Sequence, residues 1–206
     1  MTDRYPIPRE RVRVETRASN SRFIATIAPA ATMPEAQAFL REIRAEMPDA
    51  THHVYAFRVG YGASVSEAMS DDGEPSGTSG PPALAVLRGA DIGNVALVIT
   101  RYFGGTKLGT GGLVHAYTEA AKAALAAVER VEKVQRVKLR VRFAYAVLER
   151  ARRALVEHEC LIEDEQFEAD VTTTFSAPVD RLVEIERVLV NLTAGAARLE
   201  RLHEGP

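Results

Sequence analysis

Two segments of the chain carry residue types that bind charged groups. The first contains Asp71, Asp72 and Glu74 within the sequence DDGEPSGTSG, and carboxylates at this spacing are possible ligands for a hard cation such as Mg²⁺. The second is the stretch 101–112, RYFGGTKLGTGG, whose backbone amides precede a helix and could hold an anion. These residue types indicate two kinds of chemistry, cation ligation and phosphate binding.

Neither segment follows a standard nucleotide or calcium motif. In the pattern G-x-x-x-x-G-K-[ST] the lysine directly follows the second glycine, whereas Lys107 lies between Gly104 and Gly109. Gly109 and Gly111 fit the start of G-x-G-x-x-G, but Val114 stands where the third glycine belongs. The acidic segment lacks the alternating ligands of a calcium-binding loop. Turn formation by the glycines and a capping or solvated role for the carboxylates therefore stay open beside anion and cation binding.

Other residues suit contacts with a nucleic acid. Arginines and lysines alternate along two expected strands, at 9–13 and 138–142, and several aromatic side chains, Tyr102 among them, are able to stack on bases. Charged strand faces are usually only solvated, so this reading depends on local clusters. The adjacent His52 and His53 would point to opposite faces of a strand, so one is expected to pack in the core and the other to face a site.

Composition limits the class of protein. The 206 residues include 46% hydrophobic residues and carry a net charge of -2, so no overall excess of positive charge attracts polyanions. The single Cys160 excludes an internal disulfide and a cysteine-based zinc site, which favours a reducing compartment and a cytoplasmic protein. No apolar run approaches the roughly 20 residues of a membrane span, and no G-x-S-x-G elbow occurs. We expect no catalytic residue, no metal and no cofactor.

Hydrophobic periodicity predicts the elements that must position these residues. In the first part of the chain, strands are expected at 9–16, 23–27, 52–59 and 95–99, and helices at 34–47, 83–87 and 113–128. The stretch 64–82 shows no apolar periodicity and is expected to be a long exposed loop. The acidic segment would lie in that loop, and the glycine-rich segment would connect the strand at 95–99 to the last helix.

The final third predicts a separate domain. Strands are expected at 134–143, around Leu161, at 167–175 and at 196–202, with helices at 146–158 and 179–191. This βαββαβ order is typical of a ferredoxin-like domain, in which both helices cover one face of an antiparallel sheet. The whole chain is therefore expected to be α+β, with domains at 1–132 and 133–206.

Four motifs, in order, resemble the IMPACT/YigZ family. They are SRFIA at 21–25, the pair His52 and His53, DDGEPSGTSG at 71–80 and RYFGGTKLGTGGLVHAY at 101–117. The resemblance covers residues 15–125, and the final third is similar to the small domain of the bacterial YigZ branch. It implies an N-terminal domain like domain 2 of ribosomal protein S5 and domain IV of elongation factor G. It also implies a ferredoxin-like C-terminal domain similar to domain V of that factor.

The resemblance also implies a function class. Eukaryotic members of the family regulate translation by binding a large partner of a stress kinase, a system absent from bacteria, and nucleic-acid or ribosome binding has been proposed for the bacterial branch. The positions that match the family pattern are Ser21, Arg22, Phe23, His52, His53, Asp71, Asp72, Gly73, Glu74, Pro75, Gly77, Arg101, Gly104, Gly105, Leu108 and Gly109. Lys107 stands where relatives often have an apolar residue.

We therefore expect a protein that binds RNA or the translation machinery, regulates translation and has no catalytic activity. The expected contact residues are Arg22, His52, His53, Arg58, Asp71, Asp72, Glu74, Arg101, Tyr102, Gly104, Gly105, Lys107, Gly109 and Gly111. Replacing Arg101 with alanine is expected to weaken binding without unfolding the protein. Two alternatives remain: an enzyme acting on a nucleotide or phosphorylated molecule, with Mg²⁺ on the acidic loop, and a protein-docking module using the free face of the C-terminal sheet.

Overall fold

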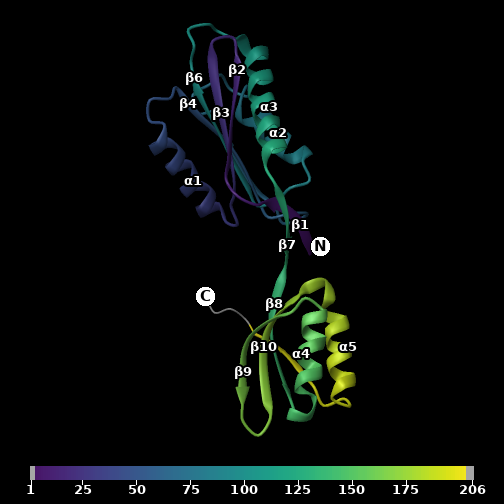
Figure 1. Cartoon of the computed structure of the whole chain (residues 1–206). Coiled ribbons are helices and arrows are strands. Elements are labelled where there is room, and N and C mark those ends of the chain that lie inside the picture. Colours follow the sequence, from purple (N-terminus) through teal and green to yellow (C-terminus); the bar gives the residue numbers. More distant parts are fainter. Residues whose placement is uncertain (1–2, 203–206) are drawn as a thin grey trace. The chain divides into compact units, whose positions relative to one another are not determined.

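The computed structural model describes residues 3–202, and the chain divides into two compact units, Met1–Lys133 and Val134–Pro206 (Figure 1). The first unit contains a five-stranded antiparallel sheet in the order β2-β3-β6-β4-β5. Its strands are β2 (Val12–Ala18), β3 (Ser21–Pro29), β4 (His52–Val59), β5 (Ser66–Ser70) and β6 (Val95–Tyr102). A separate two-stranded sheet joins β1 (Arg4–Pro8) to β7 (Arg130–Val134).

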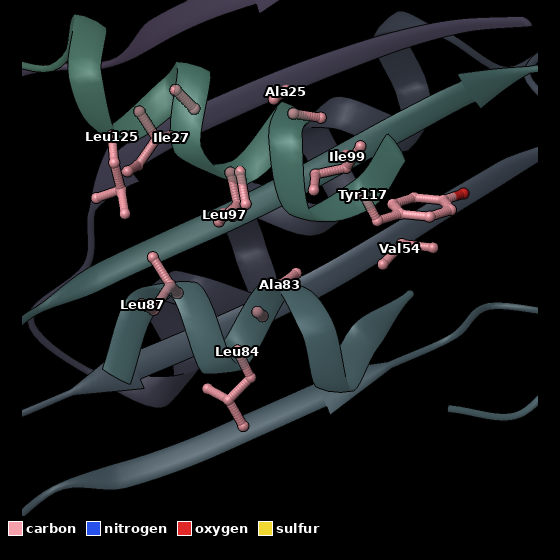
Figure 2. Packing of buried hydrophobic residues seen from close by; sticks show 14 of the residues in the cluster. Ala25, Ile27, Val54, Ala83, Leu84, Leu87, Leu97, Ile99, Tyr117 and Leu125 are labelled. Carbon is pink, nitrogen blue, oxygen red and sulfur yellow. The ribbon is translucent and has the colours of Figure 1, made fainter. Parts of the chain in front are cut away.

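Helices cover both faces of the five-stranded sheet (Figure 1). Helix α1 (Met33–Glu46) packs Phe39 and Ile43 against one face. Helices α2 (Gly80–Gly89) and α3 (Gly109–Ala127) cover the other face, where Leu87 and Leu125 belong to the same apolar cluster as Leu97 of the central strand (Figure 2). Because both faces are covered, β6 is buried along almost its whole length. The residues at the end of this strand are therefore held in a fixed position.

The start of α1 shows how the sequence specifies a helix locally. Thr32 precedes the helix and its hydroxyl accepts a hydrogen bond from the Glu35 amide, while the Glu35 carboxylate accepts one from the Ala31 amide. This reciprocal pair satisfies amide groups that have no partner within the helix. The helix expected at 34–47 accordingly agrees with the observed one within one residue at each end.

The second unit has the expected βαββαβ order. Its elements are β8 (Arg136–Phe143), α4 (Leu148–Glu157), β9 (Leu161–Phe167), β10 (Val171–Pro178), α5 (Leu182–Leu192) and β11 (Leu199–Arg201), with 3-10 turns at Tyr145–Val147 and Val179–Arg181. The strand order β11-β8-β10-β9 is antiparallel and places the first and third strands at the centre, as in ferredoxin-like domains. Phe175, Leu155 and Ile185 form its core. The chain is thus α+β, as expected.

The expected long exposed loop at 64–82 is wrong in three respects. Residues Ser66–Ser70 form β5, which pairs with β4, and α2 already begins at Gly80. An edge strand is held by backbone hydrogen bonds to its neighbour, so it forms without a strong apolar pattern. The loop between these elements is not fully exposed either, because Glu74, Thr78 and Ser79 are buried.

Two further differences concern the start of α3 and a strand that the sequence did not predict. The glycine-rich loop expected at 104–112 is shorter, because α3 begins at Gly109 and includes Gly111 in its first turn. The strand β1 was not expected, and it is anchored by the buried Tyr5, whose ring stacks on Tyr61 at 4.7 Å. No helix within residues 3–202 is long and apolar enough to cross a membrane.

Candidate functional site

The side chain of Arg101 lies at the centre of the candidate site. It stands next to the end of β6, and its Nη1 donates a hydrogen bond of 2.7 Å to Oε1 of Glu74 from the acidic loop. Its Nη2 donates to the hydroxyl of Ser21 on β3, 3.2 Å away. The side chains of Arg101 and Glu74 are only 6% and 3% exposed. The acidic and glycine-rich segments therefore converge through a buried ion pair.

Two further side chains surround the Glu74 carboxylate. Tyr117 of α3 donates its hydroxyl to Oε1 at 2.7 Å, and burial together with this hydrogen bond raises the pKa of Tyr117. Figure 2 shows this hydroxyl at the tip of a ring that otherwise packs with the apolar cluster. Nε2 of His52 lies 3.9 Å from the same oxygen. Nδ1 of His52 is 2.8 Å from the Asp72 carbonyl, which can only accept, so Nδ1 carries the proton.

Aromatic rings enclose the guanidinium of Arg101. Its Cζ lies 5.4 Å from the ring centre of Phe23 and 5.5 Å from that of Phe103, distances typical of cation–π contacts. Phe23 is fully buried, whereas Phe103 is 47% exposed. The Arg101 guanidinium thus contacts the exposed ring of Phe103, which directly follows the last residue of β6.

Beside this ring lies a cavity of about 340 Å³. Its walls are the residues Glu74, Pro75, Arg101, Phe103, Lys107, Leu108, Gly109, Thr110 and Leu113. The first turn of α3 forms one side of it, and within the described chain that turn has neither a side-chain cap nor an acidic residue. The first turn itself therefore supplies no group that neutralises the positive end of the helix dipole at the cavity. We call this space the α3 cavity.

Asp71 organises the acidic loop. Its Oδ1 accepts hydrogen bonds from the amide and hydroxyl of Ser79 and from the Gly80 amide, and its Oδ2 accepts one from the Gly77 amide. Partial burial alone would raise the pKa of Asp71, but the hydrogen bonds from Ser79, Gly77 and Gly80 outweigh it and hold the pKa below the usual value. Asp71 thus joins the loop to the start of α2.

Asp72 binds other partners than Glu74 and Asp71 do. Its Oδ1 accepts from Arg44 of α1 and its Oδ2 from the His53 amide, both at 2.6 Å. The three acidic residues therefore bind three different groups and do not share one ligand position. Across residues 3–202, no group of three or more His, Cys, Asp or Glu side chains is arranged to hold a metal ion. The Mg²⁺-dependent alternative gains no support from this geometry.

The two histidines lie on opposite sides of β4. His53 is buried, its Nδ1 lies 3.2 Å from the Thr100 hydroxyl, and burial lowers its pKa. His52 faces the buried ion pair. One histidine is therefore a packing residue and the other belongs to the site.

The other expected contact residues are distributed unevenly. Arg22 bonds Glu15 and lies over the ring of Tyr102, whose hydroxyl donates to Asp49, so these two residues form a neighbouring exposed surface. Arg58 lies apart. It pairs with Val95, at the opposite end of β6 from Arg101, and bonds Glu67.

The four expected glycines have different environments. Gly104 passes close to the backbone of Asn20, and its amide donates to the hydroxyl of Ser21 at 3.2 Å. Gly105, with φ +83°, uses the left-handed region that favours glycine. Gly109 lines the α3 cavity and Gly111 lies in the exposed first turn of α3.

Sequence reasoning did not select Tyr117, Ser21 or Leu113 as site residues. A tyrosine on the alanine-rich face of a helix was the available signal for Tyr117, because a buried phenol needs a polar partner. Cys160, in the second unit, is buried, and burial raises the pKa of its thiol to about 11, so the thiol stays protonated and unreactive at neutral pH.

Acid is expected to destabilise the first unit partly through Asp71. Its pKa is lower in the folded protein than in the unfolded chain, so its stabilising effect is complete above about pH 4 and disappears as the pH falls through the folded value. Asp71→Asn should be less stable than the wild type at neutral pH, and the difference should shrink below about pH 4. Denaturant unfolding between neutral and acidic pH measures this difference, and a constant difference would contradict it.

The architecture and the site define the class of protein. The first unit is a sheet covered by helices on both faces, with a buried arginine–glutamate pair beneath a glycine-rich turn, and a ferredoxin-like unit follows it in the chain. A family model described as the Impact N-terminal domain matches residues 19–125, and one described as a domain of unknown function (DUF1949) matches residues 141–196.

The chain belongs to the IMPACT family. It is 33% identical to the IMPACT family member YigZ of Escherichia coli (strain K12), over 96% of this chain and 98% of that protein. It is 35% identical to an IMPACT family member of Haemophilus influenzae, over 81% and 82% of the respective chains. A crystal structure of a hypothetical protein superposes with a TM-score of 0.73 at 32% identity, with both chains completely covered. The family resemblance inferred from the four motifs is confirmed.

Proposed function

We propose that the protein binds RNA, in free form or as part of the ribosome, and regulates translation in the cytoplasm without catalysing a reaction. The single observation that carries the proposal is the α3 cavity. There the uncapped first turn of α3, the side chain of Lys107 and the exposed ring of Phe103 lie together. Amides at a helix start and a lysine suit phosphate, and an exposed aromatic ring suits a base.

The hydrogen bonds of the acidic residues support a role without catalysis. Within the described residues Glu74 is engaged by Arg101 and Tyr117, and Asp71 by backbone amides. A general base needs a lone pair directed at a substrate, whereas both oxygens of Asp71 and Oε1 of Glu74 accept hydrogen bonds from protein donors. Phosphate contacts alone give salt-dependent affinity with little sequence preference.

Co-sedimentation with ribosomes and ribosomal subunits tests the proposal. Binding is expected at about 50 mM salt and should weaken strongly at about 200 mM, because phosphate contacts release counterions. Lys107→Ala is expected to weaken binding several-fold and to reduce the salt dependence by roughly one phosphate contact.

Lys122→Ala is the matched control. It removes the same charge from an exposed lysine within α3, whose side chain pairs with Glu119. Lack of ribosome binding by the wild-type protein at low salt would overturn the ribosomal part of the proposal. Equal losses for the two lysine variants would remove Lys107 from the contact surface.

A further inference from the structure

The α3 cavity has the dimensions and lining of a site for one nucleotide unit. Its volume of about 340 Å³ lies within the range of small-molecule pockets. Its lining combines apolar groups of Pro75, Leu108 and Leu113 with charged and polar groups of other residues. A nucleotide has the same division, with an apolar base face and an anionic phosphate.

The charges around the cavity favour an anion. Arg101 and Lys107 contribute two cations and Glu74 one carboxylate, and that carboxylate is already bonded to Arg101 and Tyr117. The dipole of the 19-residue helix α3 adds positive potential at its first turn.

A second observation comes from Arg101 itself. This residue is only 5% exposed, and its Nε has no hydrogen-bond partner among residues 3–202. Buried guanidinium groups normally have their donors paired, so one donor of this side chain stays unsatisfied, although Glu74 balances its charge. Arg101 also lines the cavity, so this unsatisfied donor belongs to a side chain that an anion placed there would approach.

Phe103 provides a platform for a base. Its ring is held in place by the guanidinium of Arg101, 5.5 Å from the ring centre, and yet it remains 47% exposed. An aromatic ring fixed in this way loses little side-chain entropy when a base stacks on it. Exposed aromatic rings next to cationic groups are the usual platform for bases of single strands.

Resting on the proposed function, we infer that the α3 cavity binds one unpaired nucleotide of a single RNA strand, with its base on Phe103 and its phosphate at the first turn of α3. Paired bases in a duplex are already stacked on their neighbours and cannot offer a face to this ring. The protein therefore prefers single-stranded to double-stranded RNA.

Fluorescence anisotropy with labelled RNA of about 12 nucleotides, a length within the usual site sizes of single-strand binders, tests this inference. Phe103→Ala should weaken binding of the single strand about tenfold. The same substitution should leave binding of an abasic strand of equal length unchanged. Phe167→Ala removes a similarly exposed ring, 55% exposed, from the second unit and serves as the matched control.

The outcomes distinguish failure of the inference about the α3 cavity from failure of the proposed function. Equal affinities of the wild type and Phe103→Ala, or equal losses on normal and abasic strands, would overturn the inference even where salt-sensitive ribosome binding persists. Tighter binding of a duplex than of the single strand would also overturn it. If AMP alone competes at the same concentration as the strand does, the site is one for free nucleotides and the inference is wrong. Absence of ribosome binding together with selective binding of single-stranded RNA would contradict only the ribosomal part of the proposed function.

Discussion

Replacing Arg101 with alanine is expected to lower the free energy of unfolding of the first unit by about 3–5 kcal/mol. The reason is that the substitution leaves the Glu74 carboxylate buried without its cation, with the Tyr117 hydroxyl as its main remaining partner. Removing one partner of a buried pair costs far more than the pair contributes net to stability. Denaturant unfolding, combined with hydrogen exchange of peptides from β6, measures this loss in the first unit.

Arg22→Ala is the matched control for this substitution. Arg22 lies on the neighbouring strand, its side chain is 45% exposed, and its partner Glu15 is also accessible to solvent. Exposed ion pairs contribute little, so this variant should unfold almost as the wild type does. Equal stability of the Arg101 and Arg22 variants would show that the buried pair is dispensable.

The burial of Arg101 changes an expectation drawn from the sequence. There the Arg101→Ala variant was expected to lose binding while remaining folded. Because the side chain is 6% exposed and ion-paired, any loss of binding would be inseparable from a loss of stability. Lys107 and Phe103 are the better positions for testing contact with a ligand.

Replacing Gly104 with alanine is expected to destabilise the first unit by about 3 kcal/mol. A Cβ atom at this position would lie 1.9 Å from the carbonyl oxygen and 2.0 Å from the carbonyl carbon of Asn20. Both are backbone atoms, so relief requires the β2–β3 turn or the end of β6 to move. That movement would also disturb the bond from the Gly104 amide to Ser21. Thermal and denaturant unfolding measure the effect.

Gly111→Ala separates this clash from a general effect of adding a methyl group. Gly111 lies in the first turn of α3, and a Cβ there would meet no heavy atom within 4 Å. Alanine favours helix over glycine, so this variant should be as stable as the wild type or more stable by up to about 1 kcal/mol. A Gly104→Ala protein as stable as Gly111→Ala would show that the turn adapts without strain.

Local patterns predicted most of the fold. The strand expected at 52–59 coincides with β4, because a short run of β-branched and aromatic apolar residues between turns specifies a buried strand without reference to the rest of the chain. The order of elements in the second unit followed in the same way. By contrast, β1 depends on a distant partner, β7, and β5 on the preceding strand β4, and short strands of this kind carry little periodicity of their own.

The candidate site was predicted less completely. The sequence indicated both motif loops, but the bond between Glu74 and Arg101 joins residues 27 positions apart and follows from tertiary packing. Arg58 was grouped with this site, although six residues along an extended strand separate it from His52 by about 20 Å. Distance along a strand, and not residue type, excludes Arg58 from the site.

The pairing of β1 with β7 has a consequence for how the first unit folds. The ion pair between Arg4 and Glu132 spans 128 positions, and the bond from the Arg9 amide to the Glu129 carbonyl spans nearly as many. During synthesis the N-terminal strand must therefore wait for its partner until almost the whole unit has left the ribosome. Contacts so distant along the chain slow folding, because a long loop must close before they form. We expect β1 and β7 to be the last strands of their unit to gain protection from hydrogen exchange during refolding.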